Sequence, residues 1–133
     1  MKALLDSDAL IALYSPSDAL SRRAKIIYKR LLEEKTECFI TNLVLQETAT
    51  VISNKFGQDQ SLEFIDRIEK IEVEQIFVNE RLTVKAWHIF KSQKKKGTSF
   101  IDCANVAVFE EMGADMIMSF DKFYQRKGLK TSS

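Results

Sequence analysis

The first thirteen residues constrain the fold most, because a short apolar run there leads directly into two acidic residues and a second apolar segment. Residues 3–5 form the run, which is typical of the central strand of a parallel sheet buried on both faces. Asp6 therefore follows the carboxyl end of a strand, where open α/β sheets bind their ligands. Residues 9–13 predict a short helix, so Asp6 can instead cap that helix and Asp8 can lie near the positive end of its dipole.

The length of 133 residues, with 45% hydrophobic and 29% charged residues, is typical of a single globular domain, expected here over residues 1–133. The apolar runs are too short to span a bilayer, and with a strand at the very start we expect no secretory signal. Cys38 and Cys103 lack the spacing of a disulfide framework or a zinc site, which fits a reducing cytoplasm. The net charge of +1 indicates no partner by itself.

Short apolar runs alternate with amphipathic segments along the rest of the chain. Four strands are expected, at residues 3–5, 38–40, 73–78 and 116–118. Helices are expected over residues 9–13, 20–31, 45–56, 62–68, 82–90, 101–108 and 122–126. Connections of this length require crossovers, so the pattern predicts an α/β fold whose parallel sheet is covered by helices on both faces. Leu129 can begin a short edge strand, and residues 128–133 are expected to fray.

Helix-capping residues add detail at two of these helices. Asn42 is expected to cap the helix after the second strand, and Gly57 is expected to end it. Ser99 and Asp102 have the spacing of a capping box, which gives Asp102 a purely structural alternative.

Four acidic side chains are expected to meet at one edge of this sheet. Asp6 and Asp121 each follow a strand directly, so both fall on the carboxyl edge that parallel strands share. Asp102 lies in the first turn of one helix, and Glu47 lies in the second turn of another, between its core-facing positions. Two unit charges about 4 Å apart repel by roughly 4 kcal/mol at an effective dielectric near 20, a cost that a bound divalent cation removes. Capping or a solvated position would explain each acid singly, but Glu47 least readily.

The donor atoms of these four acids are all carboxylate oxygens. Oxygen ligands without a His or Cys cluster favour Mg²⁺ or Mn²⁺ over zinc. Such an ion orients a phosphodiester, lowers the pKa of a bound water and neutralises charge on the leaving oxygen. Because the sequence shows no conspicuous protein nucleophile, hydrolysis by an activated water is the simplest mechanism it supports. Whether one ion or two would be used stays open.

Four segments of the chain resemble, in order and spacing, the successive motifs of PIN-domain nucleases. The segments are residues 4–13, 41–47, 99–104 and 113–123. The resemblance extends over essentially the whole chain, and the single-domain length resembles the VapC-type toxins of prokaryotic toxin–antitoxin pairs. The resemblance implies a three-layer α/β/α fold around a central parallel sheet of four to five strands.

The resemblance also implies an enzyme, a Mg²⁺- or Mn²⁺-dependent endoribonuclease that cuts single-stranded regions of RNA. The family's acidic positions, both catalytic and metal-binding, fall on Asp6, Glu47, Asp102 and Asp121. Ser119 matches a Ser or Thr position that supports the last of these acids. Asp8 stands where the family more often has Asn or Ser, and we interpret it as a helix-dipole residue, with an accessory metal ligand as the alternative.

The partners implied by the resemblance are an RNA substrate, a second copy of the chain in a homodimer, and an antitoxin protein laid across the cleft. A toxin and a ribosomal-RNA or tRNA processing enzyme stay open as alternatives. Just before the helix that carries Asp102 lie Lys94, Lys95 and Lys96. These lysines are expected either to hold an RNA backbone electrostatically, without reading bases, or to form a solvated loop.

Two other functions fit parts of the sequence. Asp6 and Asp8 have the nucleophile–acid spacing of haloacid dehalogenase-class phosphatases, in which Asp6 would attack phosphate and Asp8 would donate a proton. The chain is short for that fold. Those phosphatases also have a pair of acids late in the chain, and here the corresponding segment supplies only Asp121. The other alternative is a non-catalytic binding module whose acidic cleft holds a cation or an arginine of a partner. Loss of Glu47 should barely affect a phosphatase and should abolish a PIN-type nuclease.

Overall fold

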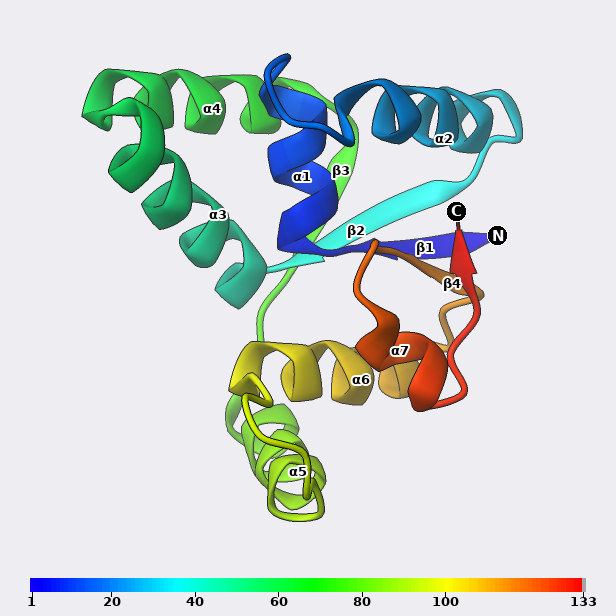
Figure 1. Cartoon of the computed structure of the whole chain (residues 1–133). Coiled ribbons are helices and arrows are strands. Elements are labelled where there is room, and N and C mark those ends of the chain that lie inside the picture. The colour runs from blue at the N-terminus through cyan, green and yellow to red at the C-terminus, as the bar shows by residue number, and fades with distance from the viewer. Residues whose placement is uncertain (133) are drawn as a thin grey trace.

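The computed structural model describes residues 1–132, and a five-stranded sheet runs through their centre (Figure 1). The strands are β1 (Lys2–Leu5), β2 (Glu37–Thr41), β3 (Val73–Ile76), β4 (Met116–Met118) and β5 (Thr131–Ser132). Their order is β3-β2-β1-β4-β5, and each neighbouring pair is parallel, as the alternation of strands and helices predicts. The acidic stretch after residue 5 therefore leaves the sheet from its central strand.

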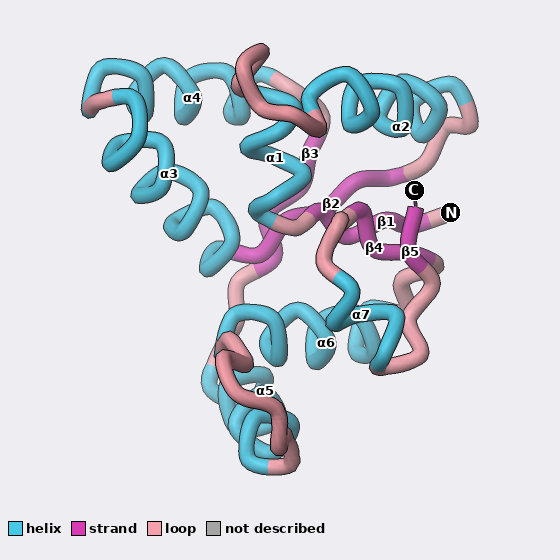
Figure 2. The backbone as a smooth tube through the Cα atoms, in the orientation of Figure 1, coloured by secondary structure: helices cyan, strands magenta, loops and turns pink. Residues whose placement is uncertain are grey.

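Seven helices cover the two faces of the sheet in the described part of the chain. They are α1 (Ser7–Tyr14), α2 (Ser21–Glu33), α3 (Asn42–Phe56), α4 (Gln58–Lys70), α5 (Glu80–Lys91), α6 (Phe100–Met112) and α7 (Lys122–Arg126). Helices α1 to α4 lie on one side and α5 to α7 on the other, which is the expected three-layer α/β/α arrangement (Figures 1 and 2). None of these helices combines the length and apolar character that crossing a membrane requires.

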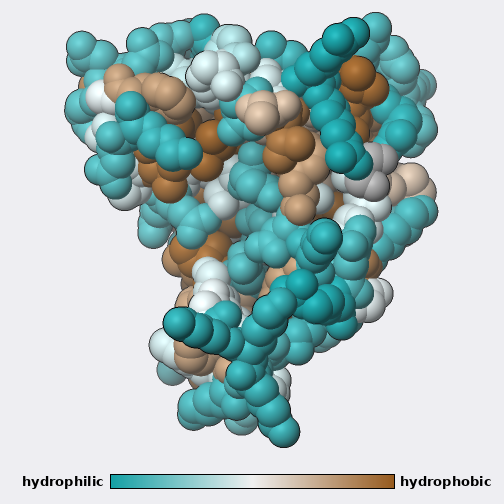
Figure 3. Space-filling model, viewed as in Figure 1, coloured by the Kyte–Doolittle hydropathy of each residue, from teal (hydrophilic) through white to brown (hydrophobic). Residues whose placement is uncertain are grey.

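The side chains of β1 alternate between two hydrophobic cores. Ala3 and Leu5 pack with α1 to α4, whereas Leu4 packs with α5 to α7, and all three are fully buried. Strands β2 and β4 alternate in the same way. Because helices cover both faces, each position of these strands needs an apolar side chain, which explains their unbroken apolar runs. Hydrophobic patches are visible between the helices around α1 to α4, and hydrophilic side chains cover most of the α5 to α7 region (Figure 3).

The helix expected over residues 62–68 is longer than the sequence pattern indicates. Gly57 lies between α3 and α4 and is at once the C-cap of one helix and the N-cap of the other. Its φ of 102° reverses the chain within a single residue, a conformation that a residue with a side chain rarely adopts. Helix α4 therefore begins at Gln58, directly after the turn, and continues to Lys70.

The expected cap at Asn42 is also wrong by one residue. Thr41, still in an extended conformation, caps α3 by accepting a hydrogen bond from the Val44 N–H at 3.0 Å. The Asn42 side chain instead accepts from the Val78 N–H at 2.7 Å. This long-range bond holds the segment that follows β3. The strand itself ends at Ile76, whereas the sequence pattern predicts that it continues to residue 78.

The end of the described chain forms a short edge strand, as one of the two expectations had it, although the strand begins at Thr131 rather than at Leu129. Thr131 and Ser132 pair in parallel with Ile117 and Met118 of β4 and make β5 the edge of the sheet. Leu129 precedes this strand and packs against the α5 to α7 core. The expectation of a frayed end over residues 128–133 is therefore wrong for Thr131–Ser132, and residue 133 lies outside the described residues.

Candidate active site

Asp6 lies at the centre of the acidic edge and is 3% exposed. Its Oδ1 atom accepts hydrogen bonds from the Ser7 N–H at 2.8 Å, which caps α1, and from the Asn105 side-chain amide at 3.1 Å. Its Oδ2 atom accepts from the Ser119 hydroxyl at 3.0 Å. Burial is the main cause that raises the pKa of Asp6 to about 7; the charges of Asp8 and Asp102 act in the same direction, and the bonds from Ser7 and Ser119 oppose them.

Asp8 does more than face the helix dipole from the first turn of α1. Its Oδ2 atom accepts from the Phe120 N–H at 2.9 Å, which ties α1 to the loop after β4, and it lies 3.3 Å from the Ser119 hydroxyl oxygen. Its Oδ1 atom is buried and has no hydrogen-bond partner among residues 1–132. Burial raises the pKa of Asp8, and the charge of Asp121 acts in the same direction. An oxygen of this kind is available to a cation.

Ser119 and Asp121 close the loop that follows β4. The Ser119 hydroxyl oxygen accepts from the Asp121 N–H at 3.1 Å, so one side chain contacts both Asp6 and the backbone of the last acid. Asp121 caps α7 by accepting from the Phe123 N–H at 2.9 Å, and its side chain is exposed. Ser119 is therefore placed where a residue supporting Asp121 would be.

Asp102 is not part of a capping box. The Ser99 hydroxyl accepts from the Ile101 N–H at 3.1 Å, whereas Asp102 Oδ1 accepts from the Tyr124 hydroxyl at 3.0 Å. Burial is the main cause that raises the pKa of Asp102 to about 6, with further contributions from the charges of Asp121, Glu47 and Asp8, whereas the bond from Tyr124 lowers it. These charges come from different parts of the chain.

Glu47 reaches the same edge from α3 and is half-buried. The Ser7 hydroxyl at the start of α1 donates a hydrogen bond to Glu47 Oε1. Since Ser7 directly follows Asp6, this bond brings Glu47 close to Asp6. The structure thus brings Asp6, Asp8, Glu47, Asp102 and Asp121 to one edge of the sheet, as the shared carboxyl ends of parallel strands predict.

The acidic edge fits a hydrated hard cation better than a closed metal cage. Among residues 1–132, no three His, Cys, Asp or Glu side chains converge closely enough to enclose a metal ion by themselves. Mg²⁺ commonly keeps several waters and contacts only one or two carboxylates. The donors here are carboxylate oxygens, one of them the buried and unpartnered Asp8 Oδ1, and their mutual repulsion contributes to the raised pKa values of Asp6 and Asp102. The donor set therefore fits a hard divalent cation.

Two fully buried polar residues at this site were missed by the sequence reasoning. The Asn105 side-chain amide donates to Asp6 and also to the Tyr124 hydroxyl oxygen at 2.9 Å. Asn105 carries a signal that could have been used, since it stands within an otherwise apolar stretch of α6 three residues after Asp102, on the same helix face. Tyr124 carries none, because its contact depends on how α7 packs against α6.

A groove of about 390 Å³ opens beside Asp102 and Asp121. One wall is the loop between α5 and α6, and the other is α7. Five basic residues line it: Lys94, Lys95, Lys96, Arg126 and Lys127. The three loop lysines are exposed, so cations lie within reach of a ligand that passes over the acids.

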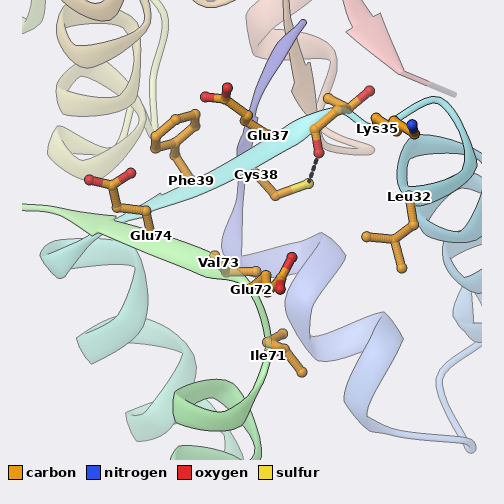
Figure 4. A pocket seen from close by; sticks show the side chains of 10 residues that line it. Leu32, Lys35, Glu37, Cys38, Phe39, Ile71, Glu72, Val73 and Glu74 are labelled. Carbon is orange, nitrogen blue, oxygen red and sulfur yellow. Dashed lines mark hydrogen bonds between the residues drawn. The ribbon is translucent and has the colours of Figure 1, made fainter.

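A second hollow, of about 600 Å³, lies at the opposite edge of the sheet (Figure 4). Glu37 and Val73, where β2 and β3 begin, line it together with Leu32 and Glu72. It contains none of the predicted site residues, so its larger volume does not mark the acidic site.

Comparison with known proteins agrees with this architecture. A sequence profile of the PIN domain matches residues 3–129. The crystal structure of VapC20 from Mycobacterium tuberculosis, described as a Sarcin-Ricin loop cleaving toxin, is similar with a TM-score of 0.83 and 23% identity, over 96% of this chain and 95% of that one.

Two further structures come from VapBC complexes. VapBC2 from Rickettsia felis, bound to a DNA fragment from their promoter, matches with a TM-score of 0.73 and 15% identity, over 98% and 97% of the two chains. VapBC-1 from nontypeable Haemophilus influenzae matches with a TM-score of 0.72 and 19% identity, over 98% and 96%. No curated protein matches the sequence. Because the profile spans nearly the whole chain and the fold is shared, the chain belongs to the PIN domain family.

Proposed function

We propose that this protein is a divalent-metal-dependent endoribonuclease that hydrolyses phosphodiester bonds in single-stranded regions of RNA. The observation that supports this best is the gathering of acids from β1, α1, α3, α6 and the loop after β4 at one edge of the sheet. Their repulsion is a standing cost that a cation would offset. Carboxylates gathered in this way favour the binding of a positively charged ligand, which offsets their repulsion.

The residues proposed to hold Mg²⁺ or Mn²⁺ and to carry the reaction are Asp6, Glu47, Asp102 and Asp121. When bound, such an ion supplies charge neutralisation at the phosphate and lowers the pKa of water. Asp102 and Asp121 line the groove and present oxygens to the substrate side. Asp6 accepts three hydrogen bonds that orient its carboxyl group, and its Oδ2 atom, which accepts from Ser119, keeps a lone pair for the ion. The buried Asp8 Oδ1 is the candidate accessory ligand.

The groove beside the acids is proposed to hold the RNA backbone. Lys94, Lys95 and Lys96 form one wall, and Arg126 and Lys127 extend the positive charge along the other. Lysines act on phosphates as point charges and carry no sequence information directly. We therefore expect this surface to position RNA strands of many sequences, with the cleavage site chosen elsewhere.

The proposed biological role is that of the toxin in a cytoplasmic toxin–antitoxin pair, acting as a homodimer. Support comes from the shared fold with VapC20, described as a Sarcin-Ricin loop cleaving toxin, and with two chains crystallised as VapBC complexes. An antitoxin protein is the partner that follows from this role. A ribosomal-RNA or tRNA processing enzyme is the alternative that the same site chemistry would serve.

The test is cleavage of total cellular RNA by the purified protein, with mapping of the new ends. We expect cleavage with Mg²⁺ or Mn²⁺, none with a chelator, and a loss of roughly 100-fold or more in Glu47→Gln and Asp102→Asn, the size that loss of an electrostatic catalytic group produces. Glu63→Gln is the matched control, because Glu63 is an exposed acid on α4 that pairs with Arg67 and lies outside the site. Metal-independent cleavage, or full activity in Asp102→Asn, would refute the proposal.

The two other functions predict different results. For a phosphatase, Asp6 would have to attack phosphate, yet it is 3% exposed and accepts three hydrogen bonds. That enzyme would form a phosphoryl adduct on Asp6 and would tolerate Glu47→Gln. A non-catalytic binding module would leave RNA intact under every condition, equally in the wild type and in Asp102→Asn.

A further inference from the structure

We propose that Tyr124 and Asn105 are positioning residues that hold Asp102 and Asp6 in the geometry needed to bind a divalent cation. This inference rests on the proposed function, since it concerns the same acids. It assigns a role to two residues that are not acids and that were not among the predicted site residues.

The hydrogen bonds between these four side chains run in one direction. The Tyr124 hydroxyl has one hydrogen, which it donates to Asp102 Oδ1 at 3.0 Å. Its oxygen must then accept, and the partner is the Asn105 amide nitrogen at 2.9 Å. The second hydrogen of that nitrogen goes to Asp6 Oδ1 at 3.1 Å. Because the Asn105 nitrogen is the donor to both Asp6 and Tyr124, the orientation of this amide is fixed from both ends.

This arrangement joins side chains from three places in the fold. Asp6 follows β1, Asp102 and Asn105 lie on α6, and Tyr124 lies on α7. The charges of Asp121, Glu47 and Asp8 all act against the ionised form of Asp102. The hydrogen bond from the Tyr124 hydroxyl favours the ionised form of the part-buried Asp102 and opposes this repulsion. The hydroxyl therefore holds a repelled group in place.

Stability alone does not explain a polar pair at this position. Asn105 and Tyr124 are both 0% exposed, and they lie where α6 packs against α7. The Asn105 Oδ1 atom has no hydrogen-bond partner in the described part of the chain, which is unfavourable for a buried polar atom. An apolar residue of similar volume would avoid that cost. Hydrogen bonds that orient metal-binding side chains are a known reason to retain polar groups, and removing one typically weakens metal binding about 10- to 100-fold.

The first test is Tyr124→Phe, which removes one oxygen and keeps the aromatic ring. That ring packs edge-on against the Phe123 ring, with 5.3 Å between the ring centroids. We expect the dissociation constant for Mn²⁺, measured by calorimetric titration, to rise about tenfold. We also expect kcat for RNA cleavage to fall while KM changes little, because the basic groove is untouched. Tyr14→Phe is the matched control, since it removes a tyrosine hydroxyl that bonds to Gln60 away from the acids.

The second variant, Asn105→Leu, separates positioning from structural support. If the residue positions the acids, the metal-free protein should unfold at the same temperature as the wild type or a higher one, while Mn²⁺ binding weakens about tenfold. If its role is only structural, the melting temperature should fall and the folded fraction should bind Mn²⁺ normally. Failure of both variants to fold would also overturn the proposal.

The outcomes distinguish this inference from the proposed function. Wild-type Mn²⁺ binding in Tyr124→Phe and Asn105→Leu, together with metal-dependent cleavage by the wild type, would refute positioning and leave the nuclease assignment intact. Absence of Mn²⁺ binding and of cleavage in the wild type would refute both.

Discussion

At the scale of single residues, the site is defined by carboxylates in surroundings that disfavour their charge. Asp6 is the extreme case, because burial and the neighbouring charges of Asp8 and Asp102 raise its pKa to about 7. Asp102 follows, with a pKa raised to about 6, chiefly by burial. These shifts make the metal-free protein sensitive to pH over a range in which most surface carboxylates are already ionised.

The stability of the metal-free protein should fall as the pH rises from about 4 to about 7. The folded state keeps a proton on Asp6 up to about pH 7, whereas the unfolded chain releases it near 3.8, so the folded state binds more protons in that interval. The free energy of unfolding, measured by urea denaturation with a chelator present, should drop by roughly 2–4 kcal/mol. Constant or rising stability across this interval would contradict the prediction.

Replacing Asp6 by Asn should remove much of this pH dependence and stabilise the metal-free protein near neutral pH. An amide at this position can still accept from Ser7 and Asn105, and its nitrogen can donate to the Ser119 oxygen in place of the present bond. The chelated variant should therefore melt at a higher temperature than the wild type, yet show no Mn²⁺-induced rise. A lower melting temperature at neutral pH would show that repulsion is not the dominant effect.

At the scale of helices and strands, the sequence predicts the arrangement well where packing is repetitive. The apolar runs of β1, β2 and β4 are explained by burial on both faces, and Asp6 and Asp121 lie at the strand ends where they were expected. Details that depend on a shift of one residue are harder to predict from the sequence. Thr41 and Asn42 are both good capping residues, and the long-range bond from Val78 to Asn42 leaves Thr41 as the cap. The contact of Tyr124 with Asp102 is of the same kind.

The cap of α3 gives a test at this scale. Thr41→Ala removes the oxygen that accepts from Val44 N–H, and losing such a cap costs about 1 kcal/mol. The urea midpoint should fall accordingly, with an unchanged slope of the unfolding free energy against urea. Thr50→Ala is the control, because Thr50 is exposed on the same helix and should change stability by less than about 0.5 kcal/mol. If the two substitutions lowered stability equally, Thr41 would not act as the cap of α3.

At the scale of the whole molecule, a net charge of +1 conceals an uneven distribution. Acids gather at the carboxyl edge of the sheet, and basic residues line the groove beside them. Composition cannot predict this separation, because it depends on the loop after α5 and on α7 lying on either side of Asp102. The position of Lys94–Lys96 just before α6 was the part that the sequence made visible.

RNA binding should depend on these lysines. Replacing Lys94, Lys95 and Lys96 together by Ala should weaken binding and flatten its salt dependence by about 0.7 in log–log slope for each phosphate that is no longer neutralised. Fluorescence anisotropy with single-stranded RNA and a chelator measures this without cleavage. The control replaces Arg22, Lys25 and Lys29, exposed basic residues of α2, with the same change in net charge. If both triple variants lose affinity equally, the groove has no special role.

The most direct test of the acidic edge as a metal site is a crystal of the wild-type protein soaked in Mn²⁺, with the ion located by its anomalous scattering. We predict an ion at the carboxyl edge, contacting carboxylates from at least two of Asp6, Glu47, Asp102 and Asp121 and otherwise bound to water. A crystal that takes up Mn²⁺ only elsewhere, or none at saturating concentration, would contradict the proposed mechanism.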